Sequence, residues 1–322
     1  MPLGEFELIN RFFARGGPQR SDVSLGIGDD AALVRVPEGT ELVVAVDTIV
    51  AGVHFPAATS PQDIGYRALA VNLSDVAAMG ATPAWATLAL TLPAADEGWL
   101  EGFCSGFFEL ARMHEVMLIG GDTNSGPLNI TVQIMGHAPI GKALRRSGAR
   151  VGDLIVVSGH VGDAAAGLAL LERRAAADQS HRDQLIARFL RPQPRIALGL
   201  ALRDVASAAI DISDGLAADL THILEASGVG ARLNLDALPL SESLAASFES
   251  QRALELAFGG GDDYELCITV PAPRAHLLAE IAASSGCPLT RVGIIEVQPG
   301  LRSFLKGIPV TPAQRGFQHF SR

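Results

Sequence analysis

Apolar residues occur along most of the chain in short runs bounded by glycine, proline or acidic residues. Runs rich in β-branched residues predict buried strands at 41–46, 86–92, 116–119, 129–135, 153–157 and 264–270. Helices are predicted at 60–79, 96–113, 163–174, 195–206, 215–226 and 273–284. Because strands follow one another as well as alternating with helices, the pattern favours a mixed α/β or α+β fold over a doubly wound sheet.

Two of the predicted helices carry specific signals. Ser60 suits the N-cap of the first, with Pro61 at its first position and Asp63 in its first turn. The second should present one apolar stripe at helical spacing, formed by Leu100, Phe103, Phe107, Leu110 and Met113.

The segment 138–153 separates two parts of ordinary domain size. It is polar, contains glycine and carries four basic residues before its first acid. We therefore expect an N-terminal domain over 1–140 and a C-terminal domain over 150–322.

Net charge, hydropathy and cysteine content exclude several classes of protein. The chain has 322 residues and a formal charge of −10, which is unsuited to sequence-independent binding of nucleic acid. It has no apolar run long enough to cross a membrane and no secretory signal at its start. Cys104, Cys267 and Cys287 are far apart, so we expect a cytoplasmic, reducing location.

Aspartates recur at the ends of apolar runs, usually beside glycine. Asp is a short ligand with the hard oxygen that Mg²⁺ prefers, and glycine lets the backbone approach a ligand closely. One Asp-Gly pair usually indicates only a turn, but Asp75 lies inside a predicted helix, where a turn does not apply. Six such patches predict one site for several divalent cations, with members Asp29, Asp30, Asp47, Asp75, Asp122, Asp211, Asp214, Asp262 and Asp263.

Familiar nucleotide motifs are absent or misplaced. The segment GIGDDA at 26–31 partly matches the dinucleotide fingerprint, but it does not open a helix after a clear strand. The sequence contains neither a Walker P-loop nor the protein-kinase motifs. If a nucleotide binds, cations and backbone amides must hold its phosphates.

Other polar residues admit two interpretations. Lys142, Arg145 and Arg146 form either a phosphate-binding cluster or a solvated linker. His54 is either structural or functional, and the segment 158–163 favours a simple helix cap over an anion site. No arrangement typical of a serine or cysteine nucleophile stands out.

The acidic motifs described above and the stretches around them, read together and in chain order, resemble the thiamine-monophosphate kinase family. The resemblance covers essentially the whole chain and lies within the wider group of aminoimidazole ribonucleotide synthetase-like ATP-binding enzymes. The matching stretches are GEFELI at 4–9, LGIGDDAAL at 25–33, VDTIVAGVHF at 46–55, ALAVNLSDVAAMGATPAW at 68–85, LIGGDT at 118–123, ALRRSGARVGD at 143–153, AIDISDGLAADL at 209–220, GGDDYELC at 260–267 and RGFQHF at 315–320.

The resemblance implies two α/β domains, with the N-terminal domain binding ATP and Mg²⁺ and pairing with a second copy into a dimer barrel. It implies Mg²⁺-dependent transfer from ATP to thiamine phosphate, giving thiamine diphosphate and ADP. The transfer is direct and in line, with no catalytic nucleophile. Several Mg²⁺ ions would offset the repulsion between the two anionic substrates.

Site residues carry over from the resemblance position by position. The Mg²⁺ ligands would be Asp30, Asp47, Asp75, Asp122, Asp211 and Asp214, with Asp29 ranked behind them. ATP would contact Gly121, Asp122, Arg146 and Ser213, and thiamine phosphate would contact His54, Asp262 and Phe317.

Two departures from the family pattern affect this site. Ala45 and Val46 stand where the family often has a hydroxyl residue, so one ligand is missing before Asp47. Asp262 stands where the family usually has glutamate, which shortens that side chain by one methylene.

Three other functions compete with this one. A relative with another acceptor is one, although the reactive N-terminal cysteine of selenophosphate synthetase and the C-terminal cysteine of the hydrogenase factor are missing. A non-catalytic nucleotide- or cation-binding protein is another, and would bind ATP without turnover. A two-metal phosphohydrolase would turn over ATP without any acceptor.

Overall fold

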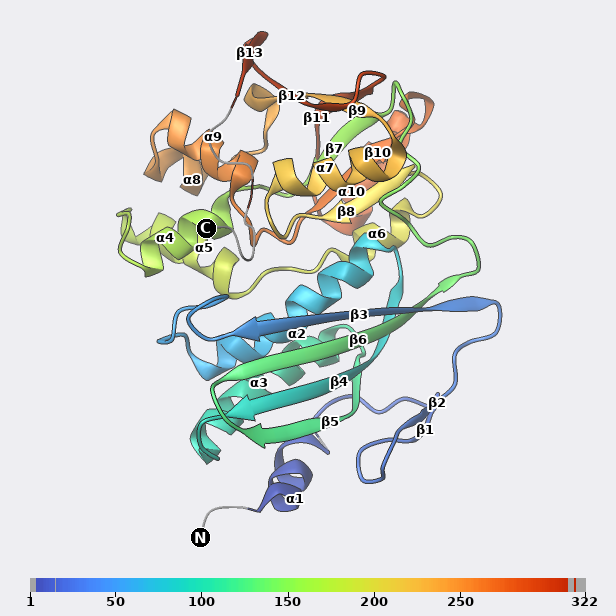
Figure 1. Cartoon of the computed structure of the whole chain (residues 1–322), viewed down its shortest axis with the longest axis vertical. Helices are drawn as coiled ribbons and strands as arrows, with labels where there is room; N and C mark the ends of the chain where they lie inside the picture. The colour runs from blue at the N-terminus through green and yellow to red at the C-terminus, as the bar shows by residue number, and fades with distance from the viewer. Residues whose placement is uncertain (1–3, 15, 312–315, 317–322) are drawn as a thin grey trace. The chain divides into compact units, whose positions relative to one another are not determined.

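The computed structural model describes residues 4–14, 16–311 and 316. The chain forms two compact units (Figure 1). The first combines Met1–Val76 with Ala81–Gly141, and the second combines Ala77–Gly80 with Lys142–Arg322. Each unit has its own sheet and its own helices.

The first unit is built on a four-stranded sheet. Its strands are β3 (Thr40–Val50), β4 (Thr82–Leu92), β5 (Met117–Ser125) and β6 (Asn129–Pro139). They lie in the order β3-β6-β4-β5, with β4 and β5 parallel and the other pairs antiparallel. A parallel pair needs a crossover connection, which the helix between β4 and β5 provides.

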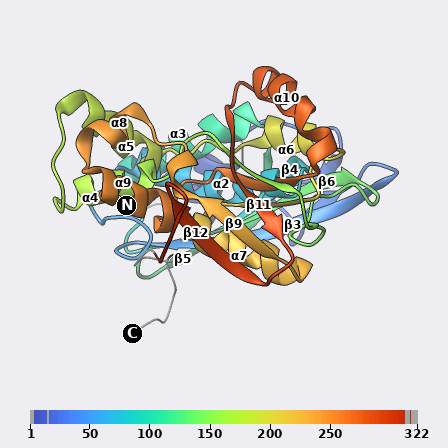
Figure 2. The same cartoon turned by 90° about the horizontal axis from the view of Figure 1, so that it is seen from above.

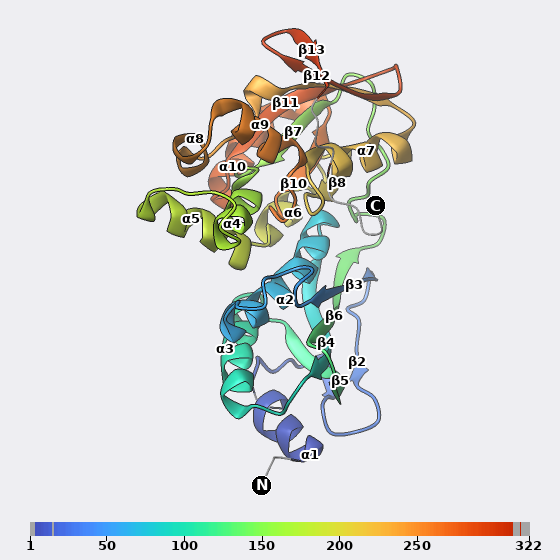
Figure 3. The same cartoon turned by 60° about the vertical axis from the view of Figure 1, so that its left-hand side comes forward.

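Two long helices, α2 (Pro61–Ala78) and α3 (Glu97–Met113), cover one face of this sheet (Figure 3). Both begin as the sequence predicts. The Ser60 hydroxyl accepts a hydrogen bond from the Asp63 amide at 3.1 Å, and the Asp96 carboxylate accepts one from the Trp99 amide at 2.9 Å. These caps satisfy amides that have no partner within the helix.

The predicted apolar stripe of α3 is confirmed except at its last position. Leu100, Phe103, Phe107 and Leu110 are buried, whereas Met113 is 64% exposed. The prediction for Met113 is therefore wrong, because the stripe passes beyond the core at the last residue of the helix.

The opposite face of the sheet is covered unevenly. The two-stranded sheet of β1 (Val23–Leu25) and β2 (Leu33–Val34) lies on this side (Figure 3). Val23 and Val34 pack there with the buried Trp85. At the β3 edge the same face is open and apolar. Its exposed side chains are Leu42, Val44 and Val46, at 47%, 50% and 59%.

The chain enters the first unit through two short helical turns. These are α1 (Glu5–Leu8) and the π-helical η1 (Ile9–Phe13), and the latter buries Phe12 and Phe13.

The second unit contains a seven-stranded, mostly antiparallel sheet. Its strands are β7 (Leu154–Ser158), β8 (Ala208–Asp211), β9 (Gly230–Asn234), β10 (Leu266–Val270), β11 (Leu289–Glu296), β12 (Gly300–Leu305) and β13 (Ile308–Val310). Their order is β13-β12-β9-β11-β7-β10-β8, and β12 and β9 are parallel. Every residue of β7, β8 and β10 is buried, which explains why these strands are continuous apolar runs.

Helices cover both faces of this second sheet (Figure 2). The helix α7 packs on the main core through Leu216, Leu220 and Ile223, while a second apolar cluster joins α4, α5, α8 and α9. The helical segments are α4 (Asp163–Leu171), α5 (Gln179–Leu190), α6 (Ile196–Leu202), α7 (Leu216–Ser227), η2 (Leu235–Ala237), α8 (Glu242–Ser247), α9 (Ser250–Gly259), η3 (Ala272–Leu277) and α10 (Leu278–Ser285).

All six predicted strands are present, so the mixed α/β prediction is confirmed. The strands predicted at 41–46, 86–92, 116–119 and 129–135 are longer in the structure. Three predicted helices are wrong in detail, since 163–174 ends at Leu171, 195–206 shortens to α6 and 273–284 begins as the 3₁₀ segment η3. In the described part of the chain no helix is long and apolar enough to cross a membrane.

Candidate functional site

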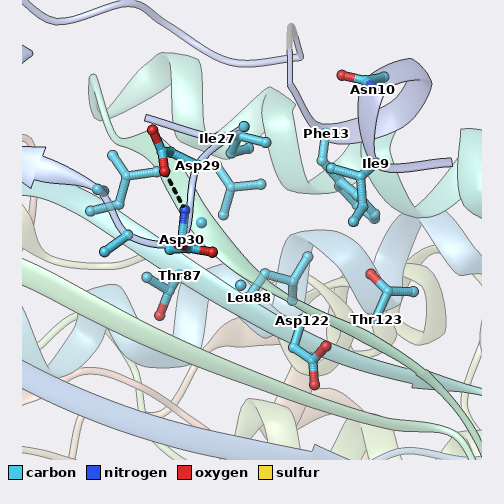
Figure 4. A pocket seen from close by; sticks show the side chains of 17 residues that line it. Ile9, Asn10, Phe13, Ile27, Asp29, Asp30, Thr87, Leu88, Asp122 and Thr123 are labelled. Atoms are coloured by element: carbon cyan, nitrogen blue, oxygen red, sulfur yellow. Dashed lines mark hydrogen bonds between the residues drawn. The ribbon is translucent and has the colours of Figure 1, made fainter. Parts of the chain in front are cut away.

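The first unit contains a pocket of about 660 Å³ at the edge of its sheet. Its walls come from η1, from the loop between β1 and β2, and from β4 and β5 (Figure 4). Three carboxylates line it, those of Asp29, Asp30 and Asp122.

The loop that carries Asp29 and Asp30 is a turn and not the start of a helix. Gly28 has a φ of +126°, and the Asp29 carboxylate accepts a hydrogen bond from the Asp30 amide at 2.8 Å. The rejection of a dinucleotide fingerprint in this segment is therefore confirmed, because no helix N-terminus is present to receive a pyrophosphate.

Gly121 allows two strands to meet at the pocket. Its φ is +150°, and a Cβ at this position would lie 1.9 Å from the carbonyl oxygen of Leu88 in β4. The strand continues through Gly121 to Ser125, so Asp122 lies within β5 opposite Ala89. The sequence pattern predicts Asp122 beyond the end of its strand, which is wrong, because β5 continues through Gly120 and Gly121.

Asp47 and Asp75 belong to the same unit but not to the walls of this pocket. The amide of Asp47 in β3 donates to the Asn72 side chain at 3.0 Å. Asp75 follows Asn72 by three residues in α2, so the two lie on the same side of the helix. Ala45 and Val46 have no hydroxyl to offer here.

His54 lies in the loop that follows β3. Its Nδ1 accepts a hydrogen bond from the Val50 amide at 3.1 Å. In a neutral ring this bond leaves the proton on Nε2, so that atom is a donor.

In the second unit, the motifs at 209–220 and 260–267 lie side by side. The amide of Ile212 donates to the carbonyl of Glu265 at 2.7 Å, and the Tyr264 amide donates back to Ile212 at 2.8 Å. The Asp262 amide donates to the Ser213 carbonyl at 2.8 Å. The structure thus brings Ser213 and Asp262 together.

Asp211 and Asp214 lie at the turn between β8 and α7. A third acid, Asp219 in α7, contacts this turn, and the sequence pattern did not single it out. The carboxylate of Asp219 accepts hydrogen bonds from the amides of Asp214 and Gly215, at 3.0 and 3.1 Å. Burial, with added repulsion from the charges of Asp211 and Asp214, raises the pKa of Asp219 to about 7. Asp219 lies inside a helix without a flanking glycine, so the pattern that identified the other acids did not reveal it.

Asp263 has a structural role. It is buried, and its carboxylate accepts hydrogen bonds from the amides of Gly162 and Ala164 at the start of α4. Burial raises the pKa of Asp263 well above its usual value. The segment 158–163 was expected to cap its own helix, but the capping side chain comes from Asp263 in another segment.

The basic cluster is divided. Lys142 pairs with Asp204 at 2.7 Å, whereas Arg146 is exposed and its carbonyl accepts a hydrogen bond from the Ser227 hydroxyl. Phe317 lies outside the described residues. A Cβ at Gly316, which is described, would lie 2.6 Å from Ala218 Cβ and 3.1 Å from the Asp214 carbonyl oxygen.

Among the described residues, no group of three or more carboxylate, imidazole or thiol side chains converges to hold a metal ion. The carboxylates of the pocket are nevertheless the type of oxygen ligand that Mg²⁺ prefers. Mg²⁺ keeps several waters and is commonly bound by one or two carboxylates together with substrate phosphates. The donor set therefore suits a metal that arrives with a phosphate ligand better than a preformed cage.

Comparison with known proteins identifies the family. Residues 28–138 match the model described as "AIR synthase related protein, N-terminal domain", and residues 150–306 match the corresponding C-terminal domain.

The chain is also similar to proteins over its full length. It is 51% identical to a thiamine-monophosphate kinase of Escherichia coli strain K12, covering 100% of this chain and 99% of that one. A crystal structure of thiamine-monophosphate kinase from Stenotrophomonas maltophilia superposes with a TM-score of 0.85 at 48% identity, covering 91% and 93%. A structure described as AaThiL complexed with AMPPCP and TMP superposes at 0.79 with 34% identity, covering 91% and 92%. The chain therefore belongs to the AIR synthase related family, and within it to the thiamine-monophosphate kinases.

Proposed function

We propose that this chain transfers the γ-phosphoryl group of ATP to thiamine phosphate, giving thiamine diphosphate and ADP. The observation that carries the proposal is 51% identity to a thiamine-monophosphate kinase over the whole chain. The structural neighbour bound to AMPPCP and TMP supports both substrates. The acidic pocket supports a reaction that needs cations between two phosphate groups.

Mg²⁺ is the proposed metal. When bound, it would neutralise the negative charge that develops on the transferring group. We assign Asp30, Asp47, Asp75, Asp122, Asp211 and Asp214 as its ligands, from the family resemblance. The exposed carboxylates of Asp30 and Asp122 support this assignment, because both line one pocket and are accessible to a metal–nucleotide complex.

The nucleotide is assigned to Gly121, Asp122, Arg146 and Ser213. The first two line the pocket. The exposed guanidinium of Arg146 suits a bidentate contact with a phosphate.

The acceptor is assigned to His54, Asp262 and Phe317. His54 is assigned from the family resemblance, and the proton that its neutral ring carries on Nε2 is of the kind that can donate to a phosphate oxygen. His54→Ala should raise the KM for thiamine phosphate more than the KM for ATP, measured by varying each substrate in turn. Equal changes in both KM values would remove His54 from the acceptor site.

No enzyme-bound nucleophile is part of the proposal. The three cysteines are buried, and burial raises the pKa of Cys104 to about 12, which disfavours the reactive thiolate. We therefore propose direct transfer, in which the chain positions the two substrates and excludes water. We place the reaction in the cytoplasm, where free thiols persist.

The release of ADP with and without thiamine phosphate tests the acceptor. We expect ADP release to depend on thiamine phosphate. ADP release that is equally fast without it would indicate a phosphohydrolase, and ATP binding without ADP release would indicate a nucleotide-binding protein.

We also propose a homodimer that forms through the first unit. β3 is an edge strand, and its exposed face carries Leu42, Val44 and Val46. An exposed apolar row on an edge strand invites pairing with another chain. A second copy would cover this row on both subunits by a two-fold arrangement, as in most homodimers.

A further inference from the structure

We propose that Glu265, held by Arg188 and Arg195, is a positioning residue for the acceptor site. It would fix the backbone at 262–264, so that Asp262 keeps its place beside Ser213. This inference rests on the proposed function, since it assumes that Asp262 serves the acceptor.

The segment 262–264 has an unfavourable backbone. Asp262 and Tyr264 have φ values of +70° and +50°, in the left-handed region that residues with side chains seldom adopt. Such residues persist only where the surrounding structure holds them. The hydrogen bonds from Asp262 to Ser213 and from Tyr264 to Ile212 hold the segment along one side.

Glu265 anchors the end of this segment. Its side chain is completely buried, and its carboxylate accepts hydrogen bonds from Arg188 Nη2 at 2.6 Å, Arg195 Nε at 2.7 Å and Ser158 Oγ at 2.6 Å. A buried carboxylate without such partners would be strongly unfavourable, so the two guanidiniums determine where it can lie. A Cβ at Gly159 would fall 2.1 Å from the carboxylate, so glycine leaves the space that Glu265 occupies.

Asp263 anchors the same segment to a different element. Its carboxylate receives the amides of Gly162 and Ala164 at the start of α4. Buried polar contacts therefore hold the side chains of Asp263 and Glu265 in place. Asp262 directly precedes Asp263 in the chain.

The turn that contains Ser213 has an anchor of its own. Asp219 receives the amides of Asp214 and Gly215 just beyond it. A change at Glu265 should therefore disturb the backbone at Asp262 more than the turn that contains Ser213, which is assigned to the nucleotide. This difference separates positioning of the acceptor from a general loss of structure.

The test replaces Glu265 by Gln in the full chain, with Asp153→Asn as the matched control. Asp153 is also a buried carboxylate of the second unit, 5% exposed, and it accepts hydrogen bonds from the backbone amide of Arg150 and the hydroxyl of Ser207. Arg188→Gln, which removes one of the two guanidiniums, is the milder variant if Glu265→Gln does not fold.

Hydrogen exchange gives a readout that does not depend on activity. In Glu265→Gln or Arg188→Gln, the amides of Asp262 and Tyr264 should exchange about tenfold faster or more, because their local opening becomes easier. They should be unchanged in Asp153→Asn. Unchanged exchange at these amides in a folded Glu265 or Arg188 variant would overturn the proposal, even if the chain has another activity.

Kinetics then test the link to the acceptor. Glu265→Gln should raise the KM for thiamine phosphate about tenfold and the KM for ATP less than about twofold. In an Asp262→Asn background the same change should add little, because both substitutions affect one contact. Additive effects, or equal changes in both KM values, would overturn the positioning role. A wild-type protein that makes no thiamine diphosphate would instead contradict the proposed function and leave the exchange result standing.

Discussion

Both the backbone conformation and the close approach of a neighbouring strand require glycine at position 121. Its φ is positive, and a Cβ would lie 1.9 Å from Leu88 O, so a side chain at this position would strain the backbone and separate β4 from β5. We expect Gly121→Ala to lower the free energy of unfolding by about 2 kcal/mol or more. Denaturant unfolding measures this change.

Gly120→Ala is the matched control for that prediction. A Cβ at Gly120 would have no atom within 4 Å, and its φ is not in the positive region. The control should have nearly wild-type stability. Equal stability of the two variants would show that Gly121 is not required for the pairing of β4 with β5.

Asp122 tests the metal assignment at a single side chain. Asp122→Asn keeps the size of the residue but removes the negative charge that would bind a shared cation. We expect transfer to fall by about 100-fold or more, as when a central charge-stabilising group is lost. The measurement is the initial rate of thiamine diphosphate formation across a range of Mg²⁺ concentrations.

The control for Asp122 is Glu38→Gln, which removes an exposed carboxylate of the same unit outside the pocket. Its rate should equal that of the wild type. Full activity in Asp122→Asn would disprove the metal role of this residue.

At the scale of elements, two glycines allow α2 and α3 to pack closely. A Cβ at Gly65 would lie 2.0 Å from Phe103 O, and one at Gly106 would lie 1.8 Å from Gln62 O. Alanine is the better helix former by about 1 kcal/mol. We nevertheless expect Gly106→Ala to lower the melting temperature, because the helices must move apart and lose packing.

Gly98→Ala in the same helix gives the opposite expectation. Gly98 is exposed, and the nearest atom to a Cβ would be an Asp96 oxygen at 3.4 Å. This variant should melt at or above the wild-type temperature. A Gly106→Ala protein that is as stable as Gly98→Ala would contradict the close packing of the two helices.

The elements that the sequence predicted are those in which local pattern and burial agree. Continuous apolar runs identified β7 and β10, cap residues identified α2, and an apolar stripe at helical spacing identified α3. The elements that the pattern missed include β9 and β11, which contribute buried residues to the main core, and β12 and β13, whose residues are mostly half-buried or exposed. It also missed α5, which begins with the polar residues 179–184. In such segments long-range pairing determines the structure, and a local pattern cannot show it.

The same distinction applies to the candidate site. Acids beside glycine could be recognised because both residues lie in one short motif. The importance of Glu265 could not, because its partners Arg188 and Ser158 are 77 and 107 residues away in the sequence. The capping of α4 by Asp263 depends on a similarly distant contact, 101 residues from Gly162.

At the scale of the whole molecule, the exposed face of β3 tests the proposed dimer. Val44→Asp places a charge in the centre of the apolar row, where burial against a second copy would be costly. We expect wild type to sediment as a dimer and Val44→Asp as a monomer in analytical ultracentrifugation.

Val297→Asp is the control for this experiment, since Val297 is 76% exposed but lies in the second unit. It should remain a dimer. A monomeric wild type, or a Val44→Asp protein that dimerises as tightly as the control, would contradict the interface at β3.

The central claim is the identity of the product. The most direct test incubates the full chain with ATP and thiamine phosphate, in Mg²⁺ and in excess chelator, and quantifies thiamine diphosphate and ADP after separation. We predict one thiamine diphosphate for each ADP in Mg²⁺ and neither product with chelator. ADP without thiamine diphosphate, or no turnover despite clear binding of ATP, would contradict the account.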